Sequence, residues 1–349
     1  MATPKDKYPI ITDSGDEAIA AAPVIVSASR STDIPAFYSD WFFHRLNKGY
    51  SAWINVFNGK KYYISYHKTR FIVFWSKNPF PLLRHIDFLR KRQTGCYIHF
   101  TLNDYEKEGL EKRVPKLEKR IETFKTLVDV LGKGSVIWRF DPLILTDSIT
   151  PEILLERIGN IGNLIHDYCE KLVFSFADIL QYAKVKRNLE KNNILYKDWT
   201  IDQMTGFCQK LVELNRGWNL KLASCGEAHE FTGIEHNRCI DDKLILRLSK
   251  NPAVWDFLEA KQCPGPDLFG NLPKNAIKLD DGSYAIVEKN NRDNGQRSAC
   301  CCAKSKDIGQ YNTCPHLCEY CYANNGKKSV SANHARHLRN PCCDLIACK

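Results

Sequence analysis

Residues 71–78 read FIVFWSKN, an apolar run that ends abruptly in three polar residues. A continuous apolar stretch rich in aromatic and β-branched side chains is typical of a strand covered on both faces, as in a parallel sheet. Five further runs have the same character, at residues 24–29, 97–102, 136–140, 172–176 and 220–225. We therefore expect six buried parallel strands.

Segments of helical period lie between these runs. Residues 111–131 place their apolar side chains on one helical face, residues 150–168 open with a threonine N-cap followed by proline, and residues 200–214 open with the Thr-x-x-Gln pattern of a capping box. The alternation of strands and helices predicts parallel βαβ units and hence an α/β fold. The order of the elements alone leaves a doubly wound sheet and a barrel as alternatives.

The alternation stops near residue 250, where prolines interrupt the chain and a hairpin is expected at 280–282. No repeat of solenoid period and no low-complexity tract is present. We expect four segments: a flexible N-terminus at 1–22, an α/β body at 23–250, a cysteine-rich cluster-binding region at 251–330 and a tail at 331–349.

The composition excludes several classes of protein. The chain has 349 residues, of which 44% are apolar and 26% charged, as in soluble globular proteins rather than disordered, collagen-like or coiled-coil chains. No stretch approaches ~18 uninterrupted apolar residues, and residues 1–22 lack a basic segment leading into an apolar run, so we expect no membrane span and no secretory signal. A cytoplasmic protein is predicted. The net charge of +10 suits either a polyanionic partner or a well-solvated surface.

The cysteines are the most unusual part of the composition. Their number is odd, 15, and nine of them lie in the last 50 residues. In a large cytoplasmic protein such clustered thiols favour metal binding or redox chemistry over a disulfide framework. For Cys342, Cys343 and Cys348 two interpretations stay open, a frayed terminus or a further redox or metal segment.

Polar side chains follow several of the predicted strands. Because the carboxyl ends of parallel strands face the ligand site in α/β proteins, these residues predict the rim of an active site. Turn formation and helix capping are the alternative for each residue taken singly. On the substrate side we expect catalytic roles for Arg30, Asp33, Arg139 and Asp141, and a cofactor-binding role for Ser76, Lys77, Asn78 and Glu227. Either arginine could hold a carboxylate or phosphate through two hydrogen bonds.

Residues 313–324 read TCPHLCEYCYAN and place Cys314, Cys318 and Cys321 at the spacing C-x3-C-x2-C. Three thiolates on one short loop can ligate three corners of a [4Fe–4S] cluster and leave the fourth iron without a protein ligand. A structural zinc site, completed by His316 or by a cysteine of the 300–302 segment, is the alternative.

A second cysteine group predicts a second metal centre. Cys300 and Cys302 form a C-x-C pair, and Cys225 and Cys239 lie upstream, so that four thiols are available. Four thiolates suit a second [4Fe–4S] cluster or a zinc ion. Cys225 has an alternative as an ordinary buried thiol, and Cys301 is either a bystander or a substitute ligand. His229 and His236 could ligate a metal, although capping or surface roles explain them as well.

The C-x3-C-x-aromatic-C pattern resembles the signature of radical S-adenosylmethionine (SAM) enzymes, in particular the spore photoproduct lyase branch. A wider resemblance extends from Val24 to Asn325 and matches a family described as domain of unknown function 1848. The strings that carry it are SASRSTDIPAFY, FWSKNP, FTLNDY, WRFDP, CGE with RCID, and SKDIGQYNTCPHLCEYCYAN.

The resemblance implies a partial (β/α) barrel with a C-terminal iron–sulfur cap. It implies that SAM binds the unique iron, is cleaved reductively to a 5′-deoxyadenosyl radical, and lies with its adenine near Tyr320. The triplet follows all the strands, so the C-terminal loop must fold back over their carboxyl ends. An electron donor such as a flavodoxin or ferredoxin is expected, together with a small-molecule or nucleic-acid substrate that the sequence does not identify.

Two other functions are alternatives to this hypothesis. One is a nucleic-acid lyase or modifying enzyme of the same chemistry, which the photoproduct-lyase-like motif and the basic net charge favour. The other is a zinc-stabilised nucleic-acid-binding protein without catalysis.

Overall fold

The main sheet contains eight strands, and every neighbouring pair in it is parallel. The computed structural model describes residues 7–55, 58–297 and 299–348. Across the sheet the order is β13-β12-β10-β8-β7-β6-β3-β17. The strands are β3 (Ile25–Ala28), β6 (Phe71–Ser76), β7 (Gly95–Thr101), β8 (Val136–Leu143), β10 (Lys171–Phe176), β12 (Lys221–Ser224), β13 (Glu235–His236) and β17 (Lys306–Asp307).

From β3 to β12 the strands lie side by side in chain order. The order does not reverse between β3 and β13, and only β17 returns to the other side of β3. The prediction of an α/β fold with six buried parallel strands is confirmed. Among the described residues the edge strands β13 and β17 do not pair with each other, so the sheet is open.

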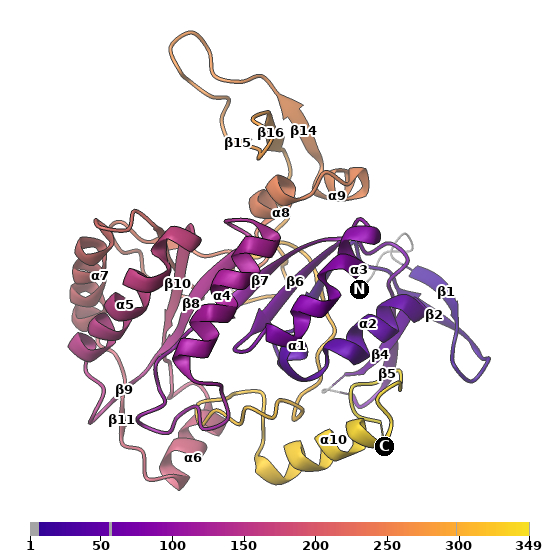
Figure 1. Ribbon diagram of the computed structural model, residues 1–349, viewed down its shortest axis with the longest axis horizontal. Helices are drawn as coiled ribbons and strands as arrows, with labels where there is room; N and C mark the ends of the chain where they lie inside the picture. The colour runs from indigo at the N-terminus through magenta and orange to yellow at the C-terminus, as the bar shows by residue number, and fades with distance from the viewer. Residues whose placement is uncertain (1–6, 56–57, 298, 349) are drawn as a thin grey trace.

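Both faces of the sheet are buried, which explains why its strands are apolar throughout. On one face, Phe74, Phe100 and Trp138 pack in a core with the helices α4 (Leu117–Leu131), α5 (Pro151–Ile165) and α7 (Ile201–Asn215), which Figure 1 shows across that face. On the other, Val73 and Tyr97 pack against α8 (Asp242–Leu248) and α9 (Pro252–Leu258). No helix in the described part of the chain is both long and apolar enough to cross a bilayer.

The helix boundaries follow local chemistry. The Thr150 side chain accepts the Ile153 N–H at the start of α5, and a complete capping box of Thr200 and Gln203 opens α7, both as predicted. The helix expected at 111–131 begins only at Leu117. The residue that precedes a proline avoids helical backbone angles, so Pro115 delays the start of this helix.

The N-terminal segment differs from the prediction of a flexible N-terminus at 1–22. Its described part forms an antiparallel hairpin, β1 (Lys7–Ile11) and β2 (Glu17–Ala21), in a small sheet with β5 (Lys61–Ser65) and β4 (Tyr50–Ile54). The Asp13 carboxylate accepts a 2.7 Å bond from the buried Arg45 guanidinium. This contact joins residues distant in sequence, so local hydrophobicity does not reveal it.

The chain beyond residue 250 contains two further ordered parts. A three-stranded sheet of β14 (Ala260–Cys263), β16 (Tyr284–Val287) and β15 (Ala276–Lys278) projects beyond the main sheet (Figure 1) and includes the predicted hairpin at 280–282. The helix α10 (Lys327–Arg339) crosses the boundary expected at 330.

The segment that follows α10 is packed, which differs from the interpretation of Cys342, Cys343 and Cys348 as part of a frayed terminus. Ile346 lies in the main core, and Cys343 and Cys348 form a disulfide, although no disulfide was expected. The Trp41 indole N–H donates to the Cys343 carbonyl at 2.7 Å. Packing against α2 (Ser39–Lys48) and β4 therefore orders the tail.

The C-terminal segment rejoins the main sheet beside its first strand. β17 pairs with β3, and the Asp307 carboxylate accepts bonds from Ser27 Oγ at 2.7 Å and from the Arg30 N–H at 2.8 Å. Two residues later the chain passes so close to β3 that a Cβ on Gly309 would lie 1.7 Å from Ser29 Oγ. This close approach brings the cysteine motif to the carboxyl edge of the sheet.

Gly309→Ala is expected to destabilise the protein by about 1–3 kcal/mol, the usual cost of overpacking a buried site. The added methyl group would also lie 2.3 Å from Ser31 Oγ, and the two serine hydroxyls contact each other. The measurement is chemical denaturation. Gly206→Ala on α7 is the matched control, because an added Cβ there has no atom within 4 Å and should be neutral or stabilising. Equal stability of both variants would contradict the close approach.

Candidate functional site

The Asp33 carboxylate joins three separate segments at the carboxyl edge of the sheet. It follows β3 and accepts hydrogen bonds from Ser76 Oγ at 2.7 Å and from the Lys77 N–H at 2.8 Å, both at the end of β6. It also lies 2.9 Å from Nε2 of His316, which belongs to the cysteine motif. Asp33 and His316 are both buried. The carboxylate therefore fixes the motif loop on the strand ends.

The His316 imidazole has an acceptor on each side. Its Nε2 faces Asp33, and its Nδ1 lies 3.2 Å from the Arg113 carbonyl oxygen. The ring of Phe37, from the short helix α1 (Ile34–Phe37), meets the imidazole edge-on at 4.6 Å between ring centroids. His316 is thus a positioning residue of the motif loop, held through both of its ring nitrogens.

The Tyr320 hydroxyl belongs to a buried polar network. The Lys77 ammonium donates to this hydroxyl at 2.8 Å and to the Glu111 carboxylate at 2.7 Å, and Tyr320 in turn donates to Glu111. Asn103 Nδ2 donates to the same hydroxyl at 3.2 Å. Burial alone would raise the pKa of Glu111, but the charges of Lys77 and Arg120 lower it, so the carboxyl stays ionised. Tyr320 therefore anchors the motif loop through its hydroxyl.

The three motif thiols lie in a largely desolvated environment. Cys318 is buried, whereas Cys314 and Cys321 are half-buried. Burial raises the pKa of all three, although Lys77 opposes this effect at Cys318, and the N–H groups of Ala323 and Asn324 oppose it at Cys321. Without a cation the thiols hold their protons at neutral pH, and a bound metal would displace those protons.

The four cysteines predicted for a second centre form a chain of pairwise sulfur contacts, although among the described residues they are not a group whose donor atoms all lie within 4.8 Å of one another. The sulfurs of Cys225 and Cys239 lie 3.3 Å apart. The Cys302 sulfur accepts the Ile240 N–H at 3.5 Å and interacts with the thiols of Cys239 and Cys300. These thiols come from the ends of β12 and β13 and from the segment before β17. A donor set of four soft sulfurs fits an iron–sulfur cluster or zinc.

Two arginines face this second cysteine group. The Arg139 guanidinium donates to Cys239 Sγ at 3.3 Å and to the Asp141 carboxylate. Arg30 stacks over the Trp75 ring at 5.6 Å; burial alone would lower the pKa of Arg30, but the thiols of Cys302 and Cys239 and the Asp307 carboxylate raise it. Positive charge beside the sulfurs stabilises their thiolate forms.

A hydrogen-bonded path joins the two cysteine groups. Asn103 Nδ2 donates to the Asp141 carbonyl at 3.0 Å, and its Oδ1 accepts the Asp141 N–H at 2.9 Å. The Asp141 carboxylate contacts Arg139 and the hydroxyl of Ser175. Since Asn103 also contacts Tyr320, the path runs from Cys239 through Arg139, Asp141 and Asn103 to the motif loop. The strand ends therefore fix both cysteine groups in one rigid frame.

The remaining predicted residues lie at the edges of this site. The Asn78 N–H donates to Ser76 Oγ, which shapes the turn after β6. Glu227 contacts the N–H of its neighbour Ala228, a local turn contact. His229 and His236 are exposed. Sequence reasoning missed Glu111, whose surroundings in the chain, EGLEKR, are typical of an exposed loop; only its burial against Lys77 reveals its role.

Cys300 is expected to be the most reactive thiol of the second group in the reduced, metal-free protein. The hydrogen bond with Cys302 lowers the pKa of Cys300 to about 7, whereas burial raises the pKa of Cys96 to about 12. The thiolate is the nucleophile, so alkylation of Cys300 should rise through neutral pH while Cys96 stays unmodified. Peptide mass spectrometry after iodoacetamide treatment measures both. The same pH profile at both cysteines would contradict the hydrogen bond.

The family model described as "Domain of unknown function (DUF1848)" matches residues 25–323, which include the main sheet, both cysteine groups and the motif loop. The search of curated proteins and the search of solved structures found no match. Since the family model covers most of the chain, the protein belongs to the DUF1848 family.

Proposed function

We propose that the protein is a radical SAM enzyme whose [4Fe–4S] cluster is held by Cys314, Cys318 and Cys321. The observation that carries the proposal is the position of the motif: the C-x3-C-x2-C loop lies on the carboxyl ends of parallel strands, held there by Asp33 and Lys77. The carboxyl edge is where α/β proteins place their ligands.

The same proposal describes the main sheet as a partial (β/α) barrel with an iron–sulfur cap. Sequential strand order from β3 to β12 supports this description, because a barrel winds in one direction. β17 and the motif loop would form the cap, since they return to the strand β3 with which the sheet begins.

When bound, the cluster and SAM would supply reductive cleavage of the sulfonium and a 5′-deoxyadenosyl radical for hydrogen abstraction. The chain itself positions the loop through the Asp33–His316 contact, places the Lys77 charge beside Cys318, and surrounds both with buried side chains that exclude water. Charge and hydrogen bonds near the sulfurs are the means by which a protein tunes a cluster's potential.

Arg30 is the best candidate for contact with a carboxylate or phosphate of the substrate or cofactor. Its Nη2 is buried and has no hydrogen-bond partner among the described residues. Arg139, in contrast, already donates to Asp141 and Cys239. An unpartnered buried guanidinium nitrogen is costly and suits an anionic ligand.

The second cysteine group is proposed as a further [4Fe–4S] cluster, with zinc as the alternative metal. Support comes from the chain of contacts between the four thiols and from Arg139, which donates to one of them. An external one-electron donor such as a flavodoxin or ferredoxin would reduce the protein.

Anaerobic reconstitution tests the proposal. Protein loaded with iron and sulfide should be brown, and its visible absorbance should bleach on reduction. With SAM and dithionite it should release 5′-deoxyadenosine, detected by chromatography. A fully loaded protein that releases none would overturn the proposed reaction, and a colourless protein with zinc bound at the motif would overturn the proposed cofactor.

A further inference from the structure

We propose that Cys343, Asp344 and Cys348 form a zinc site when the two cysteines are reduced. This site lies outside the two cysteine groups described above and beyond the residues that the family model matches. The donor atoms of these three residues all lie within 4.8 Å of one another. No other group of three potential ligands in the described part of the chain meets this criterion. The proposal does not depend on the proposed function.

The distances suit tetrahedral zinc. Cys343 Sγ lies 3.6 Å from Asp344 Oδ1. Tetrahedral zinc with Zn–S of about 2.3 Å and Zn–O of about 2.0 Å places a sulfur and an oxygen about 3.5 Å apart, and two sulfurs about 3.8 Å apart. Reduction frees the two sulfurs to separate by that amount. A disulfide and a metal bound to both thiolates exclude each other, so the zinc site belongs to the dithiol form.

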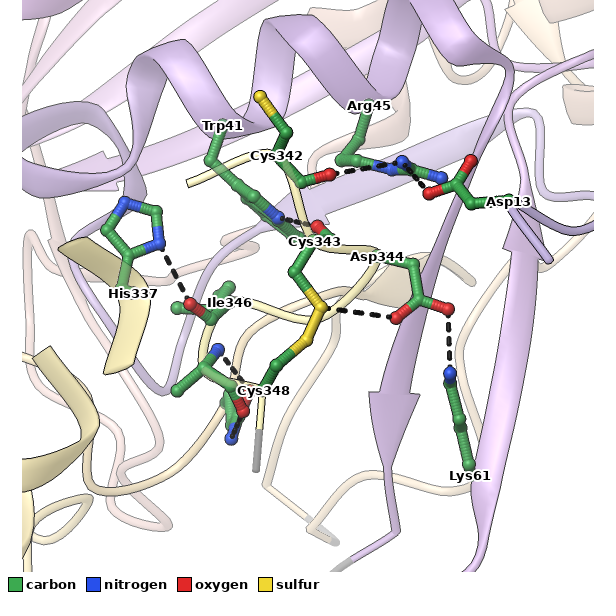
Figure 2. The surroundings of a disulfide bond; sticks show 12 residues. Asp13, Trp41, Arg45, Lys61, His337, Cys342, Cys343, Asp344, Ile346 and Cys348 are labelled. Atoms are coloured by element: carbon green, nitrogen blue, oxygen red, sulfur yellow. Dashed lines mark hydrogen bonds and ion pairs between the residues drawn. A yellow bond between two sulfur atoms is a disulfide. The ribbon is translucent and has the colours of Figure 1, made fainter. Parts of the chain in front are cut away.

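The second carboxylate oxygen of the site is already fixed. Asp344 Oδ2 accepts a 2.7 Å bond from the Lys61 ammonium on β5, which leaves Oδ1 directed toward the sulfurs (Figure 2). A hydrogen bond to the second oxygen of a ligating carboxylate is a regular feature of metal sites, because it orients the ligand.

The backbone of residues 343–346 is held by hydrogen bonds to α2, β4 and α10. Figure 2 shows the Trp41 indole against the Cys343 carbonyl, a bond of 2.7 Å. The Ala52 N–H donates to the Asp344 carbonyl at 2.7 Å, and the His337 ring contacts the Ile346 carbonyl at 2.9 Å. These bonds involve main-chain atoms and do not need the disulfide. The ligands should therefore stay near one another after reduction.

The donor set favours zinc over harder or larger ions. Two thiolates and one carboxylate suit a borderline-soft ion that accepts four ligands, whereas calcium and magnesium prefer oxygen ligands throughout. The Cys342 sulfur is exposed and points away from the group in Figure 2, so water is the expected fourth ligand.

The test is a zinc footprint on the full chain. The protein is reduced with a phosphine reductant, freed of metal, divided into samples with and without zinc chloride, and alkylated with iodoacetamide. Peptide mass spectrometry then reports Cys342, Cys343 and Cys348 separately, so zinc bound at other cysteines does not interfere. We expect zinc to slow alkylation of Cys343 and Cys348 together and to leave Cys342 reactive.

Single substitutions show which side chains the zinc protection requires. Lys61→Met leaves every ligand in place and should weaken zinc protection by about 10–100-fold, the usual effect of losing a group that orients a ligand. Asp344→Asn should weaken it further, and Cys342→Ser should not change it. Circular dichroism checks that each variant is folded.

Three results would overturn the site. The first is equal alkylation of Cys343 and Cys348 with and without zinc in the wild-type protein. The second is protection that survives Asp344→Asn unchanged. The third is a disulfide that persists after the other thiols are fully reduced. None of these results bears on SAM cleavage at the motif loop, so failure here and failure of the proposed function can be told apart.

Discussion

Cys318→Ala should abolish SAM cleavage, lowering the yield of 5′-deoxyadenosine by at least about a thousandfold, equivalent to about 4 kcal/mol of barrier. Cys318 is the buried member of the motif, and the Lys77 charge lies near it. If its thiolate ligates the cluster, alanine leaves two ligands at the motif, too few to hold the cluster with its unique iron directed outward. The measurement is product formation after anaerobic reconstitution, together with iron content.

Cys96→Ala is the matched control for this experiment. Cys96 is a half-buried thiol on β7 that burial keeps protonated, with its pKa raised to about 12. The control should retain wild-type product and iron. A Cys318→Ala protein that still forms 5′-deoxyadenosine would show that Cys318 is not a ligand of the catalytic cluster.

Breaking the contact between Asp33 and His316 should detach the motif loop from the strand ends. Removal of one partner of a buried hydrogen bond costs about 1–3 kcal/mol, because the other partner is left unsatisfied. We therefore expect Asp33→Asn and His316→Gln each to lower the free energy of unfolding by this amount and to reduce iron incorporation. Urea denaturation and iron analysis provide the two readouts.

The double variant distinguishes this contact from general damage to the fold. Because the two side chains lie 2.9 Å apart, the effects of the two substitutions should overlap, so that the double variant is more stable than their sum predicts. Iron incorporation should fall with either substitution. Strictly additive losses, or full iron incorporation in Asp33→Asn, would show that Asp33 does not hold the loop.

The main sheet could be predicted because burial on both faces leaves a local pattern in the sequence. β6 is apolar up to its last residue, Ser76, and β7 is mostly apolar and ends at Thr101. The strand order could not be predicted. A parallel sheet whose strands follow chain order and one whose order reverses at a switch point have the same alternation of strands and helices in the sequence. The N-terminal hairpin escaped prediction because it depends on distant contacts such as that between Asp13 and Arg45.

The sequence identified many residues of the candidate site but not the contacts between them. Cysteine spacing predicted both groups, and the strand-end rule found Asp33 and Lys77. Their contacts depend on the third dimension: the Asp33 carboxylate accepts hydrogen bonds from β6 and the motif loop, so its oxygens are already engaged in positioning. Glu111 and the Cys343–Cys348 disulfide lie in segments whose sequence resembles exposed loop and frayed terminus.

β17 joins one of the last segments of the chain to the first strand of the sheet, and the bond between Ser27 and Asp307 spans 280 residues. A ribosome adds about 5–20 residues per second, so β3 to β12 emerge several seconds before β17. During that time the β3 edge has no partner, and an unpaired edge invites wrong pairing. The carboxyl edge therefore receives its cysteine loop only after β3 to β12 have been synthesised, and a chain terminated before β17 would contain these strands without the motif.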